Sequence, residues 1–135
     1  MYILDTDICS YIMKEHPVET LETLQQKAQD GEIICISVIT YSELLFGAER
    51  SSHPAKHRAL IKELCDRLEQ IIPWDKAAAN EYAKLHSYLL KKGNPIGNND
   101  TMIAGHALST ESILVTNNLR HFKKIPKLKV ENWVS

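Results

Sequence analysis

The chain has 135 residues, of which 44 % are hydrophobic and 24 % are charged, and its formal net charge is −1. This length and composition predict one soluble globular domain over residues 1–135, and they exclude a membrane protein because no apolar run approaches the roughly 20 residues that span a bilayer. The three cysteines are odd in number and widely spaced, which favours buried thiols over disulfides or a zinc site. With no leader-like segment at the start, we expect a cytoplasmic protein.

The first predicted element is a short strand that ends in an acid. Residues 2–4 are apolar or aromatic and run directly into Asp5, after which Thr6 and Asp7 are suited to cap a helix that opens at residue 8. A buried parallel strand delivers the residue at its carboxyl end to the crevice where open α/β sheets bind ligands. Asp5 is therefore a candidate for chemistry, with helix capping by Asp5 and Asp7 as the alternative.

The next strand leads into a helix with a second acid. A helix over residues 17–29 closes at the Asp30-Gly31 pair, and the apolar, β-branched run 33–36 predicts a strand buried on both faces. Ser37 is suited to cap a helix over about residues 38–49. Glu43 lies among apolar neighbours in this helix, where burial of a carboxylate is costly unless it is paired or bound to a metal. An exposed Glu on the polar edge of the helix is the alternative.

The central part of the chain predicts helices and a strand without a candidate for catalysis. Residues 53–69 predict a polar amphipathic helix, and residues 71–74 predict a short third strand. Asp75 is well placed to cap a helix over residues 76–91, which ends at Gly93. We therefore assign Asp75 to structure rather than to chemistry.

A loop rich in Gly and Asn then opens a helix of small, apolar side chains over about residues 100–108. Asp100 stands at its start and faces the edge of the sheet if the small residues pack closely on a strand. The alternative is that Asp100 only stabilises the first turn of the helix. His106 lies within the apolar part, and we expect a buried core histidine with its hydrogen bonds satisfied rather than a ligand.

Residues 113–116 predict a fourth strand that ends in the polar residues Thr116, Asn117 and Asn118. A short irregular segment, a small edge strand near Val130 and a docked tail follow. Residues 91–135 carry a local charge of +4, which is compatible with a phosphate-contacting face, although such runs are more often solvated surface. Strands alternate with helices throughout, which predicts an α/β fold with a mostly parallel sheet of four to five strands and helices on both faces.

In such a sheet three acids can converge, namely Asp5, Glu43 and Asp100, with polar side chains from the end of the fourth strand beside them. Carboxylates brought close together repel and raise one another's pKa unless a cation lies between them. Oxygen ligands without His or Cys favour Mg²⁺ or Mn²⁺ over zinc. Such an ion orients a phosphodiester and stabilises the charge of an in-line displacement, so the residues predict metal-assisted phosphodiester hydrolysis.

Several stretches of the chain resemble a known family: MYILDTDICSYIM, SVITYSELLFGAE, PIGNNDTMIAGHAL, ILVTNN and the closing ENW. They are similar to the PIN-domain ribonucleases, and specifically to the VapC toxins of bacterial toxin–antitoxin pairs, over essentially the whole chain. The resemblance implies a single PIN domain over 1–135 with an α/β/α sandwich, a homodimer, a Mg²⁺- or Mn²⁺-dependent endoribonuclease, and a VapB antitoxin that occludes the site and assembles with the toxin on operator DNA. In the subgroup that it resembles, the substrate is the initiator tRNA, cut in its anticodon stem-loop, which inhibits translation.

The resemblance also implies roles for individual residues. The three acids of the family correspond to Asp5, Glu43 and Asp100, which are all intact and are the expected catalytic and metal-binding residues. The fourth position, often Asp in the family, is Asn118, which can bond a metal-bound water but adds no charge, so a second metal would be held more weakly. Asp7 stands where the subgroup often has Asn and either compensates for Asn118 or caps the helix, with the cap favoured. Thr116 is expected to orient ligands by hydrogen bonding.

Two other functions are compatible with parts of the sequence. An acid-x-acid motif after a strand also resembles the aspartyl-phosphate phosphatases, but that reading leaves Glu43 without a role. A PIN fold that only binds RNA or a partner protein is supported by the missing fourth acid and opposed by the intact triad. For the dimer or antitoxin interface we expect apolar helix faces in the first half of the chain, including Tyr11, Ile12, Leu45 and Phe46.

Overall fold

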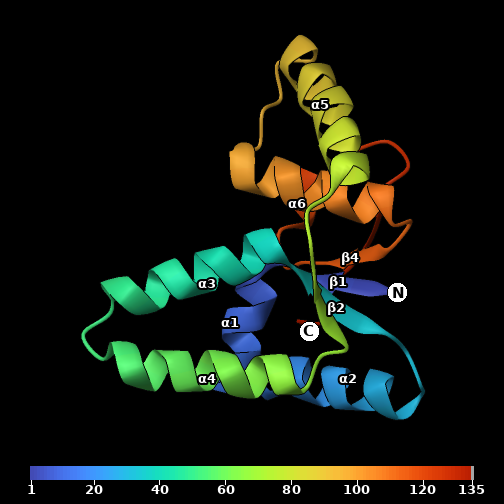
Figure 1. Ribbon diagram of the computed structural model, residues 1–135. Helices are drawn as coiled ribbons and strands as arrows, with labels where there is room; N and C mark the ends of the chain where they lie inside the picture. The colour runs from blue at the N-terminus through green and yellow to red at the C-terminus, as the bar shows by residue number, and fades with distance from the viewer. Residues whose placement is uncertain (135) are drawn as a thin grey trace.

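The computed structural model describes residues 1–134, which form a five-stranded parallel sheet with helices on both faces (Figure 1). The strands are β1 (Tyr2–Leu4), β2 (Ile34–Ser37), β3 (Gln70–Ile72), β4 (Ile113–Val115) and β5 (Lys129–Glu131), in the order β3-β2-β1-β4-β5. Every neighbouring pair is parallel, so each return along the chain needs a crossover, and helices supply it. The predicted α/β class is confirmed.

The helices divide into two groups. On one face lie α1 (Thr6–Lys14), α2 (Val18–Gln29), α3 (Val38–Arg50) and α4 (Pro54–Asp66), and on the other lie α5 (Lys76–Lys91), α6 (Asn98–Ser109) and the short α7 (Leu119–Phe122). The pleat of the central strand β1 serves both groups, because Tyr2 and Leu4 join the core under α1–α4 while Ile3 joins the core under α5 and α6. All three side chains are buried, which explains the continuous apolar run before Asp5.

Most predicted elements are confirmed, with shifts at their ends. Helix α5 has the predicted limits, and Asp75 caps it by accepting a hydrogen bond from the Ala78 backbone N–H at 3.0 Å. The strand predicted at 33–36 covers Ile34–Ser37 instead, and Ile33, which was expected to be buried, is 50 % exposed, although its carbonyl accepts a hydrogen bond from Tyr2 of β1. The strand predicted at 71–74 instead covers Gln70–Ile72, and Pro73, which has no N–H for the ladder, follows it. The helix predicted at 53–69 ends earlier, at Asp66.

Helices α3 and α4 form a hairpin that projects from the sheet (Figure 1). An ion pair between Arg58 and Glu49 joins its two helices. Near the end of α3 the Phe46 side chain is 68 % exposed, although it is large and apolar. No helix within residues 1–134 combines the length and the apolar character needed to cross a membrane.

Candidate active site

The three predicted acids meet at the carboxyl edge of the sheet. Asp5 follows β1, Glu43 lies in the second turn of α3 after β2, and Asp100 lies in the first turn of α6. Together with residues beside them they line a cavity of about 220 Å³, formed by Asp5, Thr6, Asp7, Glu43, Asp100 and Asn118. The topology explains this convergence, because β1, β2 and β4 are neighbours in a parallel sheet and their carboxyl ends open on the same side.

Asp5 has both of the roles that the sequence left open. Its Oδ1 accepts a hydrogen bond from the Ile8 backbone N–H at 3.0 Å and so caps α1, which begins at Thr6. The prediction that Thr6 and Asp7 cap this helix is therefore wrong, because both already lie in its first turn. The Asp5 side chain is also buried at the cavity wall, and this burial raises its pKa from 3.8 to about 6. The Thr116 hydroxyl and the cap bond oppose the rise, and Asp7 and Asp100 add to it.

Glu43 is held by both of its carboxylate oxygens. The Thr6 hydroxyl donates to Oε1 at 2.6 Å, and the Asn99 side-chain amide donates to Oε2 at 3.1 Å. The side chain is half-buried, between the fully buried and exposed positions that the sequence left open. Because the two donors come from α1 and α6, Glu43 ties the α3 helix to both other acid-bearing segments.

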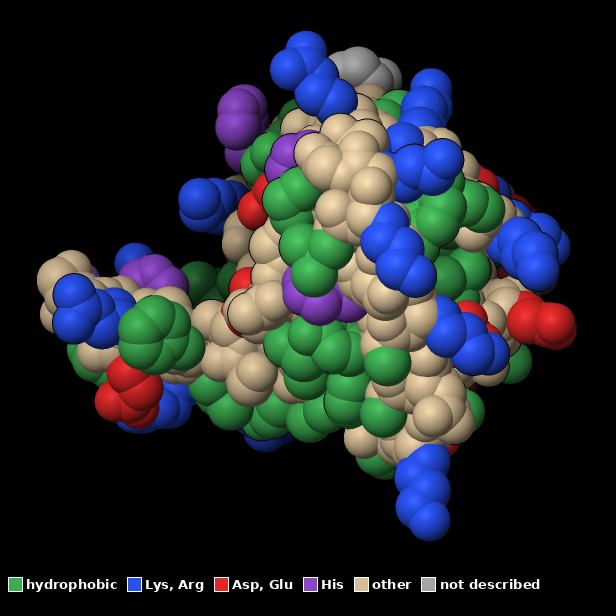
Figure 2. All heavy atoms as spheres, turned by 90° about the horizontal axis from the view of Figure 1, so that it is seen from above, with side chains coloured by type: hydrophobic (Ala, Val, Ile, Leu, Met, Phe, Trp, Pro, Cys, Tyr) green, Lys and Arg blue, Asp and Glu red, His purple; other side chains and the backbone are tan. Residues whose placement is uncertain are grey.

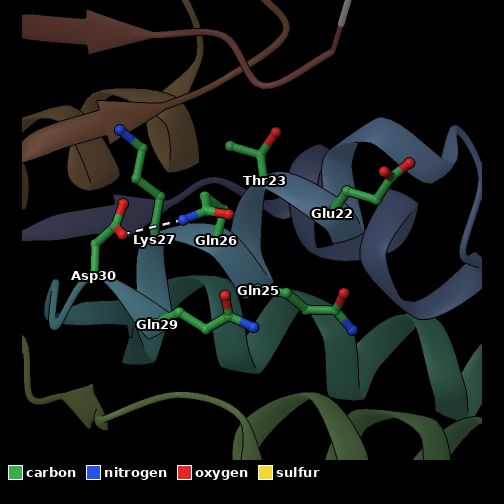
Figure 3. Close-up of a pocket in the computed structure, with 7 residues that line it drawn as sticks. All are labelled: Glu22, Thr23, Gln25, Gln26, Lys27, Gln29 and Asp30. Carbon is green, nitrogen blue, oxygen red and sulfur yellow. Dashed lines mark hydrogen bonds between the residues drawn. The ribbon is translucent and has the colours of Figure 1, made fainter.

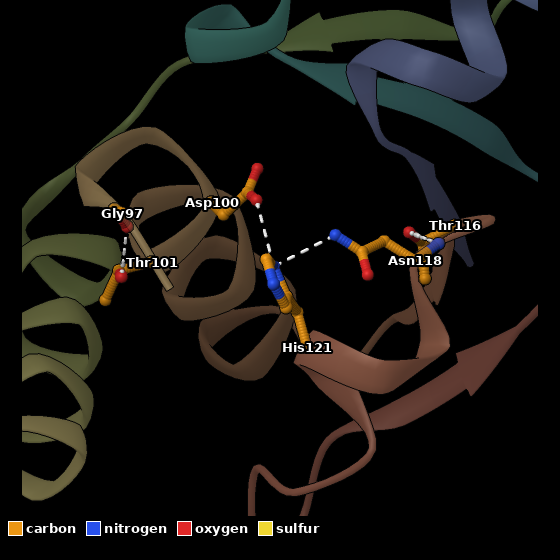
Figure 4. Close-up of polar contacts among 6 residues, drawn as sticks. All are labelled: Gly97, Asp100, Thr101, Thr116, Asn118 and His121. Carbon is orange, nitrogen blue, oxygen red and sulfur yellow. Dashed lines mark hydrogen bonds and ion pairs between the residues drawn. The ribbon is translucent and has the colours of Figure 1, made fainter. Parts of the chain in front are cut away.

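Asp100 faces His121, which lies between it and Asn118 (Figure 4). Its Oδ2 is 3.9 Å from the Nδ1 of His121, which also contacts the Asn118 amide at 2.9 Å. Partial burial raises the pKa of Asp100, and the negative charge of Glu43 raises it further, while His121 opposes the rise. The turn before α6 is made by Gly97, whose φ of +95° is in a region that residues with a Cβ rarely adopt.

The remaining polar residues predicted near the acids, Asp7, Thr116 and Asn117, occupy three different positions relative to the cavity. Asp7 is exposed at the cavity rim, in the first turn of α1 where an acid is favourable. Thr116 is buried and accepts a hydrogen bond from the Asn118 backbone N–H at 2.9 Å, which fixes the chain after β4 (Figure 4). Asn117 does not join the cavity: its side chain bonds Tyr11 and Asn132 on the surface instead.

Three contributors were not found from the sequence, namely Thr6, Asn99 and His121. Thr6 and Asn99 each adjoin a predicted acid in the sequence, which could have marked them as part of the site. Which acid they bond, however, depends on the packing of α1 and α6 against α3. His121 lies one helical turn after Asn118 in α7, where the sequence predicts only a short irregular segment.

The chemistry of the donors fits a hard divalent cation, since the cavity offers carboxylate and amide oxygens from several segments. Within residues 1–134, no three His, Cys, Asp or Glu side chains are close enough to form a ready-made ligand cluster. Mg²⁺ commonly keeps several waters and takes only one or two carboxylates directly, so a cavity of this size suits a hydrated ion. Burial, with a smaller contribution from neighbouring carboxylates, raises the pKa values of Asp5 and Asp100, and a bound cation would offset both effects.

A wider hollow, of about 500 Å³, lies on the outer surface of α2 (Figure 3). Its walls are polar side chains of that helix and its end, namely Glu22, Thr23, Gln25, Gln26, Lys27, Gln29 and Asp30. These residues come from one element and do not bring acids together from separate strands, so the hollow lacks the features of the cavity at the sheet edge.

Comparison with known proteins places this architecture in a family. The model of the PIN domain family matches residues 2–128. Ribonuclease VapC2 of Haemophilus influenzae is 41 % identical over 98 % of both chains, and the tRNA(fMet)-specific endonuclease VapC of Salmonella typhimurium is 38 % identical over 98 % of this chain and 97 % of its own length.

Solved structures agree with these sequence relatives. The toxin–antitoxin complex VapBC2 of Rickettsia felis, bound to a promoter DNA fragment, contains a chain that superposes with a TM-score of 0.91 at 37 % identity, covering 98 % of both chains. The DNA-bound VapBC of Salmonella typhimurium gives a TM-score of 0.90 at 38 % identity, over 98 % of this chain and 97 % of that one. The chain therefore belongs to the PIN-domain family and, within it, to the VapC ribonucleases.

Proposed function

We propose that this chain is the toxin of a type II toxin–antitoxin pair and cuts RNA at the cavity lined by Asp5, Glu43 and Asp100, with Mg²⁺ or Mn²⁺ as its cofactor. The observation that carries the proposal is the convergence of these carboxylates, from three distant segments, at one edge of a parallel sheet. Two relatives that are similar over nearly the whole chain are named as a ribonuclease and an endonuclease, which supports hydrolysis of a phosphodiester in RNA as the reaction.

The chain's own residues prepare the cavity for this chemistry. Asp5 presents a buried carboxylate at the cavity wall, and Thr6 and Asn99 hold both oxygens of Glu43 in one orientation. Asn118 contributes hydrogen bonds without charge, so the site has one carboxylate fewer than is common in the family. A divalent ion held by Asp5, Glu43 and Asp100 would offset their repulsion and stabilise the charge that develops on the phosphate.

The proposed substrate is the initiator tRNA, cut in its anticodon stem-loop, which would stop translation at initiation. Two relatives support this choice by name: the tRNA(fMet)-specific endonucleases of Salmonella typhimurium and Shigella flexneri are 38 % and 37 % identical to this chain. We expect the protein to act in the cytoplasm, where this substrate is found.

Cleavage of purified initiator tRNA tests the proposal. The wild type should give discrete fragments with Mg²⁺ and none with EDTA, and Asp100→Asn should abolish them. Asp66→Asn is the matched control, because Asp66 is an exposed acid of α4 outside the cavity and pairs with Lys62. Fragments that persist in EDTA would overturn the metal requirement. A folded wild type that binds tRNA and total RNA without cutting either would favour a binding module instead.

We also propose a homodimer and a VapB-type antitoxin as partners, together able to assemble on operator DNA. Two of the similar solved structures are toxin–antitoxin complexes with DNA, which supports this. The exposed Phe46 on the α3–α4 hairpin, with the partly buried Leu45 next to it in α3 and the partly buried Tyr11 in α1, suits such an interface. Ile12 is 3 % exposed and belongs to the core, so the expectation that it takes part is wrong.

Phe46→Ala tests this surface, with Leu90→Ala as a control because Leu90 is 55 % exposed on α5, on the other face of the sheet. Loss of antitoxin affinity or of dimer mass in Phe46→Ala, with both retained in Leu90→Ala, is the expected result. If neither quantity changes in Phe46→Ala, this surface is not the interface.

A further inference from the structure

A buried polar pair outside the cavity joins two of the acid-bearing segments. The Nδ1 of His106 in α6 lies 2.8 Å from the Oγ of Ser37, and the two residues are 1 % and 0 % exposed. The sequence prediction of a buried, hydrogen-bonded histidine is thus confirmed. Its partner is the residue that ends β2 and caps α3, so the bond joins the start of α3 to α6 through two residues that are 69 positions apart in the chain.

The single proton of the Ser37 hydroxyl gives the bond a direction. Ser37 Oγ already accepts the Ile39 backbone N–H at 3.1 Å, which is the cap of α3. The hydroxyl is then free to donate to His106 Nδ1, which accepts when the imidazole is neutral and carries its proton on Nε2. Burial lowers the pKa of His106 and so favours the neutral form. The histidine therefore fixes the rotamer of the hydroxyl that starts the α3 helix.

The position of this pair relates it to the acids. Ser37 precedes Glu43 by six residues in the same helical segment, and His106 follows Asp100 by six residues in α6. Helices α3 and α6 pack on each other, and the Asn99–Glu43 hydrogen bond is a second tie between them at the cavity. With one tie at the cavity and another deeper in the core, the two helices have little freedom to rotate or slide relative to each other.

We propose that His106 is a positioning residue that, through Ser37, sets the separation of Glu43 and Asp100 in the cavity. This rests on the proposed metal-dependent cleavage and adds a requirement to it. A carboxylate pair that must share a hydrated ion is sensitive to its spacing, so loosening the α3–α6 junction weakens ion binding and turnover without affecting residues that contact the RNA.

Binding of Mn²⁺, followed by the electron paramagnetic resonance of the free ion, is the primary measurement, and tRNA cleavage is the second. His106→Leu removes the acceptor but keeps the apolar volume, whereas His106→Asn keeps an acceptor at the place of Nδ1. Ile103→Val, a small truncation of a fully buried apolar residue in the same helix, is the matched control for a general loss of packing.

His106→Leu should weaken Mn²⁺ binding about tenfold, the lower end of what groups that orient ligands contribute, and should lower kcat with KM for tRNA unchanged. His106→Asn should recover most of the affinity, and Ile103→Val should bind Mn²⁺ like the wild type. Ser37→Ala removes the same bond together with the cap of α3. If His106→Leu does not fold, Ser37→Ala is compared with Ser37→Thr, which keeps a hydroxyl for both bonds. Combining Ser37→Ala with His106→Asn should cost no more than Ser37→Ala alone, since the shared bond is already gone.

The outcomes separate the two ideas. If His106→Leu and Ser37→Ala melt at lower temperature but bind Mn²⁺ as tightly as the wild type, the pair is only structural and the positioning role is overturned. If Ile103→Val weakens binding as much as His106→Leu, the effect is general packing and the role is again overturned. A folded wild type that binds no Mn²⁺ would overturn the proposed function itself and, with it, this inference.

Discussion

Neutralising Asp5 should stabilise the metal-free protein. The folded state raises the pKa of Asp5 from 3.8 to about 6, mainly through burial, so the charged form is disfavoured in the fold. At about 1.36 kcal/mol for each pH unit, the unfavourable contribution at neutral pH is about 3 kcal/mol. Asn at this position keeps an oxygen that can accept the Ile8 N–H and carries no charge. Because the amide is itself costly to bury, we expect Asp5→Asn to gain about 1–3 kcal/mol.

The stability difference between Asp5→Asn and the wild type should depend on pH. Since the folded pKa lies above the unfolded one, the penalty is absent below about pH 4, grows between pH 4 and 6 and is complete above about pH 6. The stability gap between Asp5→Asn and the wild type should therefore be largest at pH 7.5 and close as the pH falls to 4. Bound Mn²⁺ stabilises the wild type more than the variant and should narrow the gap at pH 7.5.

Thermal and urea unfolding in EDTA, across this pH range, provide the assay. A chain of this length should show about 4 °C for each kcal/mol. Asp75→Asn is the matched control, because Asp75 is also an aspartate cap that accepts a backbone N–H at 3.0 Å, but it is exposed and outside the cavity. If Asp5→Asn is less stable than the wild type in EDTA at pH 7.5, or if the gap does not change with pH, the reasoning about Asp5 is refuted.

Three further predictions concern packing and the cavity. Gly105→Ala should lower the free energy of unfolding in urea by about 1–3 kcal/mol, because the added Cβ would lie 2.8 Å from the backbone nitrogen of Tyr82. Gly47→Ala is the control, since Gly47 has open space around it and the change should cost no stability. Equal effects of the two changes would refute the close approach of α5 and α6. Asn118→Asp adds a carboxylate to the cavity, so the variant should bind Mn²⁺ more tightly in calorimetry and should be less stable than the wild type in EDTA. An unchanged Mn²⁺ affinity would mean that residue 118 does not face the ion. Asn99→Ala should lower kcat about tenfold in single-turnover cleavage, because Glu43 loses one of its two donors, and an unchanged rate would show that this contact does not orient it.

The sequence was sufficient for the placement of the acids because their signals are local. An apolar run into Asp5, and Asp100 at the start of a helix of small residues, each fix a position relative to a strand or a helix end. Parallel topology then brings such positions to one edge without further information. The limits of α5 were predictable for a similar reason, since its start is marked by a capping acid and its end by a glycine.

The contacts that other side chains make with the acids were not predictable, since they depend on how helices from different segments pack. Thr6, Asn99 and His121 reach Glu43 and Asp100 across distances in the chain of 37, 56 and 21 residues, and no short-range pattern marks such pairs. The cap of α1 was misplaced because three polar residues in a row, Asp5, Thr6 and Asp7, can all cap a helix, and only tertiary packing selects among them. On the face seen in Figure 2, most Lys and Arg side chains gather on one half of the molecule, whereas hydrophobic side chains occupy the centre of the view.

The central position of β1 has a consequence for synthesis on the ribosome. Strand β1 pairs with β2 on one side and with β4, at residues 113–115, on the other. A nascent chain that ends before residue 100 has neither the third acid nor the strand that completes the neighbourhood of Asp5. The cavity can therefore form only after residues 100–118 have been synthesised, because Asp100 and Asn118 line it and β4 lies between them.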